Sequence, residues 1–400
     1  MPFAMATEER PYKPSLPWRI TSAIEIGVVG FLSRSFLYAL NRTETYGIDN
    51  LLEILDRRSD ESKRTRGLIT VYRLDDPLTW GVLPYKYHWD PNNMRWALGS
   101  YDICFRNKSV ITLLVHRTFF SYGNTLPTHR KAYSQYGGIF QPTINQAIRL
   151  LSDPHANLAP EKSSRPADPP TLPTSLPPSD PFSAAQLTYS TNGADAFPSP
   201  SAYPFRRYGW VHIFPEGMIH QHPDKLMRYF KWGVARLILE AEPCPDVLPM
   251  WIDGPQQVMD NNRGWPRPLP RIGKDVSVAF GSPVDTEQVF GPFRQRWQEL
   301  KDRARRKRML YYPTEDPAAD PEKEVLGELN DDELKYGQEA EQLRIEVTLA
   351  VRNEVLKVRR SRGLPDEDPK RGLAETFAAE RGNPSRNGRR MGDGSVVQIE

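Results

Sequence analysis

The spacing of apolar residues along the chain predicts a mixed α/β fold. Short β-prone runs predict strands at 67–71, 210–214, 247–251 and 276–280, and another apolar run covers 109–115. Apolar positions at helical spacing predict helices at 20–40, 144–151, 231–240 and about 333–360. Because strands alternate with helices, the pattern favours a largely parallel sheet with helices on both faces.

Composition divides the chain into three parts. The stretch 152–204 holds 12 prolines in 53 residues and few large aliphatic side chains, so it is predicted to be a disordered insert. The chain is strongly charged after Phe293, and beyond Ser361 it is rich in Gly, Arg and Pro. We therefore expect an N-terminal amphipathic helix within 1–45 and a domain at 46–300 that contains the insert. A charged tail at 301–400 is expected to be helical at about 333–360 and otherwise disordered.

Charge and cysteine content exclude several classes of protein. The net charge of +3 is far from the basicity of a typical DNA-binding protein, so no nucleic-acid partner is expected. Cys104 and Cys244 are too few for a disulfide scaffold or a four-thiolate zinc site. His220, His222 and Asp224 have metal-like spacing but lack a further strong ligand at a recognisable offset, which favours a solvated loop. The sequence therefore predicts neither a metal nor a cofactor.

Two segments are candidates for membrane contact, and each has a second interpretation. The helix at 20–40 carries an apolar stripe that suits either docking on a core or lying in a membrane interface; the stripe consists of Ile20, Ile24, Val28, Leu32, Phe36 and Leu40. Glu25 and Arg34 interrupt this helix, so it is not expected to span a membrane. The basic run from Arg294 to Arg308 would attract anionic lipids or form an ion-paired, solvated helix.

Polar residues that could carry chemistry follow three of the β-like runs. They lie in the segments 75–81, 123–130 and 211–217. In open α/β sheets, ligands bind beyond the carboxyl ends of the strands, so these segments are expected to meet there. An arginine offers a fork for a phosphate group, and a nearby glycine lets backbone N–H groups approach the same group.

In order and spacing, these segments resemble the motifs of the glycerolipid acyltransferases whose first motif is His-x4-Asp. Phe214-Pro215-Glu216-Gly217 matches the third motif, and the stretch from Gly123 to Arg130 matches the second. The first is framed by Ile69-Thr70-Val71 followed by Asp75 to Gly81. Further matches lie at 230–234 and 247–249. The resemblance is greatest to fungal enzymes that remodel cardiolipin, and it runs from the N-terminal helix to Asp285 with the insert excluded.

The resemblance implies an activity and a location. It implies a CoA-independent transacylase that moves acyl chains between phospholipids, namely cardiolipin, lysocardiolipin and phosphatidylcholine. Such a protein would be peripheral and non-spanning on the outer or inner mitochondrial membrane, on the intermembrane-space side.

The resemblance also implies roles for individual residues. Asp75 is the motif aspartate that would orient a catalytic histidine. Arg130 would hold a lipid phosphate, with Gly123 permitting close backbone approach. Glu216 would position the head group or hold Arg130. The remaining residues of the third motif, Phe214, Pro215 and Gly217, would shape the substrate pocket and its turn.

The first motif lacks its histidine. In the family an Asn-His-x-Ser segment precedes the Asp-Asp-Pro, whereas here Thr70 stands five positions before Asp75 and the span is about four residues short. Tyr72 is a poor substitute because a phenol has an unperturbed pKa near 10. His116 or His129 could enter the site in space. Either the gene model is incorrect or the protein is a pseudoenzyme that keeps a lipid-binding groove. In both cases activity should be low, because a general base contributes about 10²–10⁴-fold.

Overall fold

The computed structural model describes residues 12–72, 78–105, 117–131, 133–155, 187–217, 221–260, 262–266, 269–311 and 325–374, together with one short strand pair formed by 389–390 and 396–397. Apolar side chains from 26 to 358 form one hydrophobic core. The predicted α/β class is confirmed.

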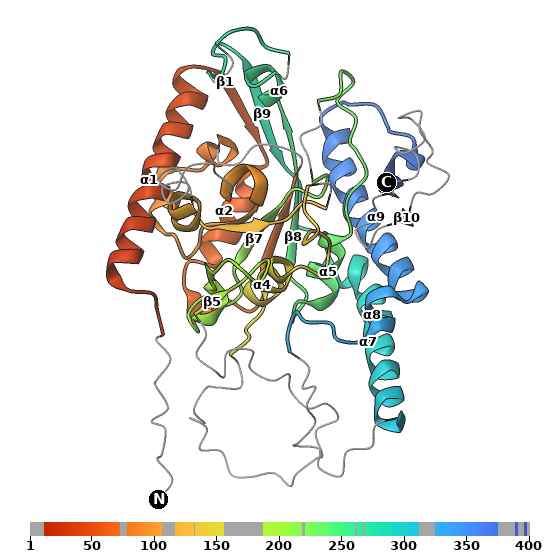
Figure 1. Ribbon diagram of the computed structural model, residues 1–400. Coiled ribbons are helices and arrows are strands. Elements are labelled where there is room, and N and C mark those ends of the chain that lie inside the picture. The colour runs from red at the N-terminus through yellow and green to blue at the C-terminus, as the bar shows by residue number, and fades with distance from the viewer. Residues whose placement is uncertain are drawn as a thin grey trace, which may run out of the picture.

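A mixed sheet of seven strands forms the centre of the molecule, in the order β1-β9-β8-β2-β7-β3-β4 (Figure 1). Only the β8–β9 pair within it is antiparallel. The strands are β1 (Arg42–Tyr46), β2 (Leu68–Val71), β3 (Trp96–Ser100), β4 (Thr125–Thr128), β7 (Trp210–Ile213), β8 (Asp246–Asp253) and β9 (Asp275–Phe280). Two short pairs lie apart from this sheet: β5 (Thr188–Tyr189) with β6 (Phe197–Pro198), and β10 (Arg389–Arg390) with β11 (Val396–Val397).

The four predicted strands are present as β2, β7, β8 and β9, whereas β1, β3 and β4 were not predicted. All residues of β2 and β7 are buried, which is why these central strands read as continuous apolar runs. The strand β1 lies at an edge of the sheet, and its sequence Arg-Thr-Glu-Thr-Tyr carries little apolar signal. The apolar run at 109–115 lies outside the described residues.

Helices lie on both sides of the sheet, with α1 along one side and α7, α8 and α9 on the other (Figure 1). The α-helices are α1 (Leu16–Ala39), α2 (Ile48–Arg57), α4 (Pro142–Leu151), α5 (Gly233–Glu240), α6 (Pro255–Val258), α7 (Thr286–Tyr311), α8 (Asp332–Tyr336) and α9 (Gln338–Ser361). Short helical turns are η1 (Glu61–Lys63), η2 (Leu78–Val82), η3 (Tyr85–Trp89), η4 (Tyr101–Phe105), η6 (Pro200–Ala202) and η8 (Pro369–Gly372). The predicted helices at 144–151, 231–240 and 333–360 are confirmed as α4, α5 and α8–α9.

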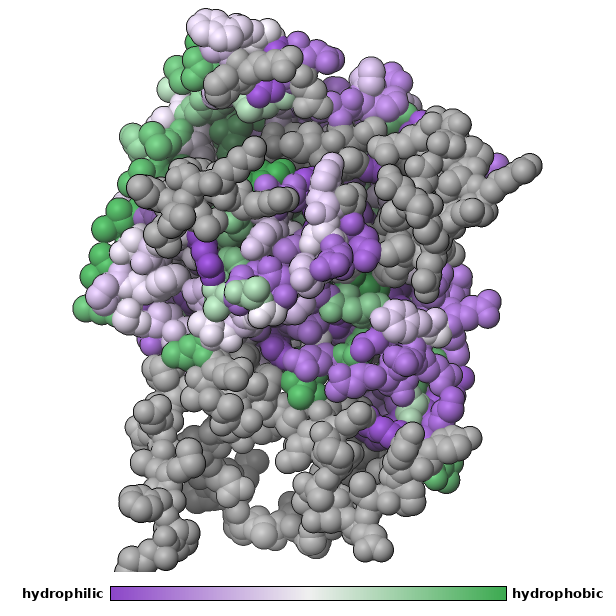
Figure 2. Space-filling view, in the orientation of Figure 1, coloured by the Kyte–Doolittle hydropathy of each residue, from purple (hydrophilic) through white to green (hydrophobic). Residues whose placement is uncertain are grey.

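The apolar stripe of α1 faces away from the domain. Five of its members are about half exposed, namely Ile20, Ile24, Val28, Leu32 and Leu40, whereas Phe36 is partly buried against the core. The opposite side of the helix is buried and combines Ile26 and Leu37 with small residues. Gly30 packs so closely on η3 that a Cβ atom on it would lie 2.4 Å from the ring of His88. Figure 2 shows this apolar surface along the edge of the molecule where α1 lies. This buried side, and not the exposed part of the stripe, therefore docks the helix.

Arg34 is the cation of α1 that fastens the helix to the domain. Its Nη1 donates to the carbonyl oxygens of Gly81, Val82 and Leu83 at 3.0–3.2 Å. Because Arg34 is bonded inward, it leaves the outer face of the helix apolar. By length and composition, α1 is the one helix among the described residues that could cross a membrane, although 28% of its most apolar window is buried.

The described ends of the Pro-rich stretch 152–204 are ordered, so the prediction of disorder is wrong for 152–155 and 187–204, while 156–186 lies outside the described residues. Residues 187–204 form the β5–β6 pair and η6, and Phe197, Ser201 and Ala202 are buried. Both Ser199 and Ser201 donate to the amide oxygen of Gln146 on α4. The high proline content hides these contacts, because a few buried side chains are enough to hold the segment on α4.

The C-terminal helices belong to the domain core. On α9, Leu343, Val347, Val351 and Val355 are buried, and they join the same core as the sheet. The prediction of disorder beyond Ser361 is wrong for residues 362–374. In this segment the side chain of Glu367 is completely buried, with ion pairs to Arg352 and Arg359.

The basic run on α7 is used mainly for contacts within the protein. Ion pairs join it to acidic residues of other elements: Arg294 to Glu242, Arg296 to Glu346, Arg303 to Glu339, and Lys307 to Glu333. Arg294 also donates to backbone carbonyls at the end of α5. These contacts favour the ion-paired helix over an anionic lipid site.

Candidate active site

A cavity of about 340 Å³ lies beyond the carboxyl ends of β3, β4 and β7. Its wall is mainly apolar and includes Ile103, Phe120, Ile139, Ile144 and Ile213. Four of the predicted site residues also line it: Arg130, Phe214, Pro215 and Gly217. The structure therefore brings the second and third motifs together at one cavity, because parallel strands that lie near one another end at the same edge of the sheet.

Arg130 follows β4 and forms an ion pair with Asp102. Its Nε lies 3.1 Å from Oδ1 of Asp102, and its Nη2 donates to Oδ2, while the guanidinium lies over the ring of Tyr133. Burial alone would raise the pKa of Asp102, but hydrogen bonds from Arg130 and Ser100 lower it overall. Because Asp102 occupies one edge of the guanidinium, Nη1 is the amino group left for a ligand.

The Phe-Pro-Glu-Gly sequence forms a turn at the end of β7. The N–H of Gly217 donates to the carbonyl of Phe214 at 3.0 Å, and Gly217 has a φ of +64°, a conformation that favours glycine. The carbonyl of Pro215 accepts from the N–H of Lys231 at 2.7 Å. A Cβ atom on Gly217 would lie 2.7 Å from the Lys231 side chain. The turn therefore sets Lys231, a second cation, on the cavity wall.

Glu216 is not among the residues that line the cavity. It is buried, and its Oε1 accepts from the backbone N–H of Arg228 at 3.2 Å. The charge of Glu216 also acts on Arg352 of α9, where it favours the charged form. The side chain thus links the third motif to the segment after it, rather than to Arg130.

Gly123 also lies outside this cavity. It lines a neighbouring space of about 80 Å³ together with Glu25, His88 and Arg95, and the two cavities share Phe120 and Thr125. A Cβ atom on Gly123 would lie 3.1 Å from Oε1 of Glu25. Burial raises the pKa of Glu25 to about 7, and burial, aided by the charge of Arg95, lowers the pKa of His88 to about 4. The absence of a side chain at Gly123 therefore allows Glu25 of α1 to pack closely against it.

The raised pKa of Glu25 predicts a pH-dependent effect on stability. Between its ordinary value of 4.5 and about 7, Glu25 is protonated in the folded chain and ionised in the unfolded chain, so it costs stability as the pH rises through this window. We expect Glu25→Gln to raise the free energy of unfolding by about 1 kcal/mol at about pH 8, a figure reduced for partial exposure, and by little at about pH 4. Urea titrations at both pH values measure this, with Glu53→Gln on the exposed face of α2 as control. An equal effect at both pH values would contradict the prediction.

His129 is the one described histidine that lines the larger cavity. Its Nε2 lies 2.8 Å from the hydroxyl oxygen of Thr191, which in turn donates to the carboxylate of Asp195. The ring stacks on Tyr101 with 4.2 Å between the centroids. Burial lowers the pKa of His129, although Asp195 and Asp102 act in the opposite direction. The hydroxyl of Thr191 therefore holds the imidazole in one orientation, and the carboxylate of Asp195 in turn fixes that hydroxyl.

The first motif is only partly within the described residues. Asp75 lies in the segment 73–77, which is outside the described residues. His116 and His220 are also outside them. Strand β2, which precedes the first motif, ends at the same edge of the sheet as β7 and the third motif, because the N–H of Tyr72 donates to the carbonyl of Ile213. The Tyr72 hydroxyl donates to the carbonyl of Ile252, and the side chain is buried. Tyr72 is thus not among the residues that line the cavity.

The sequence did not identify several polar residues at this site: Asp102, Lys231, Thr191 and Asp195. Asp102 gave no local signal, because it meets the site only through the sheet. Lys231 lay in the matching stretch 230–234 but was not assigned to the site. Thr191 and Asp195 lie in the stretch predicted to be disordered. A signal was nevertheless present in the turn Ser190-Thr191-Asn192-Gly193, where Asp195 accepts from the N–H of Thr191 at 2.7 Å and from the hydroxyl of Ser190 at 2.9 Å.

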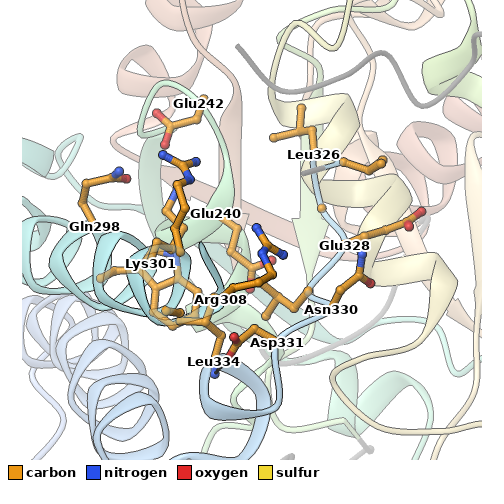
Figure 3. Close-up of a pocket in the computed structure, with 16 residues that line it drawn as sticks. Glu240, Glu242, Gln298, Lys301, Arg308, Leu326, Glu328, Asn330, Asp331 and Leu334 are labelled. Carbon is orange, nitrogen blue, oxygen red and sulfur yellow. Dashed lines mark hydrogen bonds between the residues drawn. The ribbon is translucent and has the colours of Figure 1, made fainter. Parts of the chain in front are cut away.

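A further cavity of about 250 Å³ lies between α7 and the segment 325–334 (Figure 3). Charged side chains of both signs surround it, including Glu240, Lys301 and Arg308. Its carboxylates have other partners: Glu240 pairs with Arg236, and Asp331 caps α8. No residue of the three motifs lines this cavity. Among the described residues, no cluster of three or more His, Cys, Asp or Glu side chains could hold a metal ion.

Comparison with known proteins gives several relatives. The chain is 33% identical to the tafazzin of Saccharomyces cerevisiae over 371 residues, which cover 88% of this chain and 81% of that protein. It is 26% identical to the tafazzin of Drosophila melanogaster, over 71% of this chain and 56% of that protein. It is also 26% identical to the N-acylphosphatidylethanolamine synthase of Arabidopsis thaliana, over 65% of this chain and 69% of that protein. No protein-family model matches the chain.

These relatives place the chain among acyltransferases. More narrowly, it belongs to the tafazzin family, as the extent of the match to the yeast protein shows. The predicted resemblance of the chain to acyltransferases is thereby confirmed.

Proposed function

We propose that this protein is a phospholipid–lysophospholipid transacylase that works without CoA and remodels the acyl chains of cardiolipin in mitochondria. The observation that carries this proposal is the cavity at the carboxyl ends of β3, β4 and β7. It combines an apolar wall, which suits an acyl chain, with Arg130, Lys131 and Lys231, which suit a phosphate group. The relatives named tafazzin support a phospholipid substrate.

The phosphate is proposed to bind beside Arg130. The carboxylate of Asp102 holds the guanidinium at the cavity wall through Nε and Nη2, so Nη1 remains for the lipid. Phe214 and Pro215 form the adjoining wall, and the turn closed by Gly217 places Lys231 nearby. Glu216 is proposed to act indirectly, since it fixes the segment at Arg228.

We also propose that the chain as written turns over slowly. No histidine occurs between Thr70 and Asp75, so Asp75 has no imidazole to orient at the spacing of the family. This absence favours a second candidate, a non-catalytic phospholipid-binding protein that uses the same cavity. The two candidates share lipid binding and differ in acyl transfer. His129, held by Thr191, is the group in the cavity that would supply residual base catalysis.

The protein is proposed to lie on the membrane through α1 without crossing it. The outer face of α1 is apolar, and the exposed aromatic rings of Phe31, Tyr85 and Trp89 extend it. The ring of Tyr85 makes edge contacts with Phe31 at 6.0 Å and with Trp89 at 5.7 Å between centroids. The inner face packs on η2 and η3 and is tied there by Arg34. A spanning orientation would expose this inner face to lipid, so an interfacial position fits the contacts better.

A transacylation assay tests the proposed function. The purified chain is mixed with lysocardiolipin and phosphatidylcholine that carries a labelled acyl chain, without CoA, and the label in cardiolipin is followed. Slow but measurable transfer is expected. Binding of lysocardiolipin without any transfer would favour the non-catalytic candidate, and no binding at all would contradict both.

Loss of Arg130 is expected to weaken use of the lipid phosphate. We expect Arg130→Met to lower kcat/KM for lysocardiolipin by about 10–100-fold, because charge-assisted hydrogen bonds contribute about 1.5–3 kcal/mol. Arg130→Lys keeps the charge and should lose less. Asp102→Asn, which frees the guanidinium, should raise KM more than it changes kcat. Unchanged kcat/KM in Arg130→Met would show that the ion pair with Asp102 is purely structural.

A further inference from the structure

The loop between α6 and β9 exposes large apolar side chains. We refer to its described residues, 262–266 and 269–274, as the Trp265 loop. Trp265 is 91% exposed, Ile272 61% and Leu269 57%. Exposing three large apolar side chains on so short a loop is unfavourable in water unless the loop meets an apolar surface.

The Trp265 loop continues the apolar face of α1. The N–H of Gly273 donates to the carbonyl of Leu40 at 2.7 Å, and the N–H of Arg42 donates to the carbonyl of Lys274 at 2.9 Å. These bonds set the end of the loop beside the end of α1, where Leu40 and Tyr38 are also exposed. Figure 1 shows α6 and the chain after it next to β1, which follows α1. The loop and the helix thus form neighbouring parts of one apolar surface.

The charge of the Trp265 loop is positive. Its described residues include the cations Arg263, Arg271 and Lys274 and no acidic residue. The adjoining carboxylates are engaged: Asp260 accepts from the N–H of Asn262 at 2.6 Å, and Asp275 pairs with Arg42. Exposed apolar side chains among cations are complementary to the interface of an anionic bilayer.

We propose that the Trp265 loop is a second membrane-contact element, which inserts Trp265, Leu269 and Ile272 into the interface of an anionic bilayer while its cations meet the lipid phosphates. The proposal rests on the proposed position of α1 at the membrane. Contacts at the loop and along α1 fix the orientation of the domain on the bilayer. A tryptophan suits this place because its ring is apolar and its N–H reaches the polar head groups.

Vesicle flotation tests the apolar part of the proposal. The probes are vesicles of phosphatidylcholine with and without phosphatidylglycerol, so that binding is measured without the proposed substrate cardiolipin. The triple variant Trp265→Ser, Leu269→Ser and Ile272→Ser is expected to bind at least about tenfold more weakly to both kinds of vesicle. Leu310→Ser, which removes an exposed apolar side chain from α7, is the matched control and should bind like the wild type.

The charged part has its own variant and control. Arg271→Ser with Lys274→Ser is expected to weaken binding only to vesicles with phosphatidylglycerol, by about fivefold for each cation removed. High salt should abolish this difference. Arg306→Ser on the exposed side of α7 is the control. If the triple variant binds vesicles as tightly as Leu310→Ser, the loop does not contact the membrane and the proposal is wrong.

A micelle assay separates this proposal from the proposed function. Transacylation in detergent micelles does not need docking on a bilayer, so the triple variant should keep wild-type activity there. Loss of vesicle binding with full activity in micelles supports the membrane-contact role. Loss of activity in micelles would assign the loop to the active site and overturn the proposal.

Discussion

Insertion of Asn-His-Ala-Ser between Tyr72 and Arg73 is expected to raise the transacylation rate of this chain by about 10²–10⁴-fold. After the insertion, the histidine precedes Asp75 by five positions, with Ala, Ser, Arg73 and Leu74 between them. This restores the His-x4-Asp spacing of the family. The imidazole would take the proton from the lysophospholipid hydroxyl as its oxygen attacks the donor ester, and would return the proton to the departing oxygen.

The surrounding structure favours this point of insertion. Strand β2 ends at Val71, and the N–H of Tyr72 still bonds to the carbonyl of Ile213, the last residue of β7. The ring of Tyr72 is fixed against Trp251 in an edge contact with 6.4 Å between centroids. Residues inserted after Tyr72 therefore leave the strand intact and emerge at the edge of the sheet where Phe214 lines the cavity.

A matched insertion isolates the effect of the imidazole. Asn-Ala-Ala-Ser has the same length and should give no gain in rate. The assay is transfer of labelled acyl chains from phosphatidylcholine to lysocardiolipin, with unfolding curves to show that both variants fold. Equal rates for the two insertions would mean that this chain does not use an imidazole beside Asp75. Rapid turnover by the unmodified chain would point instead to His129, and His129→Asn would then abolish it.

The sequence predicted the buried parts of the fold well. The central strands β2, β7 and β8 are covered on both faces, so each appears as a continuous apolar run. The second and third motifs were correctly expected to meet, because both follow strands of one sheet. The strand β4 was hidden because its four residues, Thr-Leu-Pro-Thr, have no apolar run.

The direction of side chains was harder to predict than the elements themselves. On α1 the apolar stripe suggested either docking or membrane contact, and the packing of Gly27 and Gly30 against η3 shows which face is inside. The motif residue Glu216 is adjacent to cavity residues in the sequence, yet the turn directs its carboxylate to the N–H of Arg228. Neither direction follows from periodicity, because both depend on contacts with distant segments.

Buried charge explains why residues 362–374 were misjudged. A Gly-, Arg- and Pro-rich sequence is typical of disorder, since it lacks apolar side chains to bury. Residues 362–374 are held instead by the carboxylate of Glu367, which meets Arg352 at 2.5 Å and Arg359 at 3.3 Å. This carboxylate also accepts from the N–H of Met227 at 2.7 Å. Such a cluster depends on pairing across the fold, which composition does not reveal.

Loss of Glu367 is expected to destabilise the protein strongly. We expect Glu367→Ala to lower the free energy of unfolding by about 3–5 kcal/mol, because it leaves the guanidinium groups of Arg352 and Arg359 buried without their carboxylate. Urea unfolding of the full chain measures this loss. Asp366→Ala is the control, because Asp366 pairs with Arg360 at the surface and should contribute less than about 1 kcal/mol.

The same change should also affect the candidate active site. Glu367 accepts from the N–H of Met227, and the next residue, Arg228, donates its N–H to Glu216 in the turn that lines the cavity. At a temperature where the Glu367→Ala variant is still folded, we therefore expect a higher KM for lysocardiolipin, which Asp366→Ala should not show. A loss of stability no greater than that of Asp366→Ala would mean that the buried arginines find other partners. The segment 362–374 would then have no part in holding the cavity in shape.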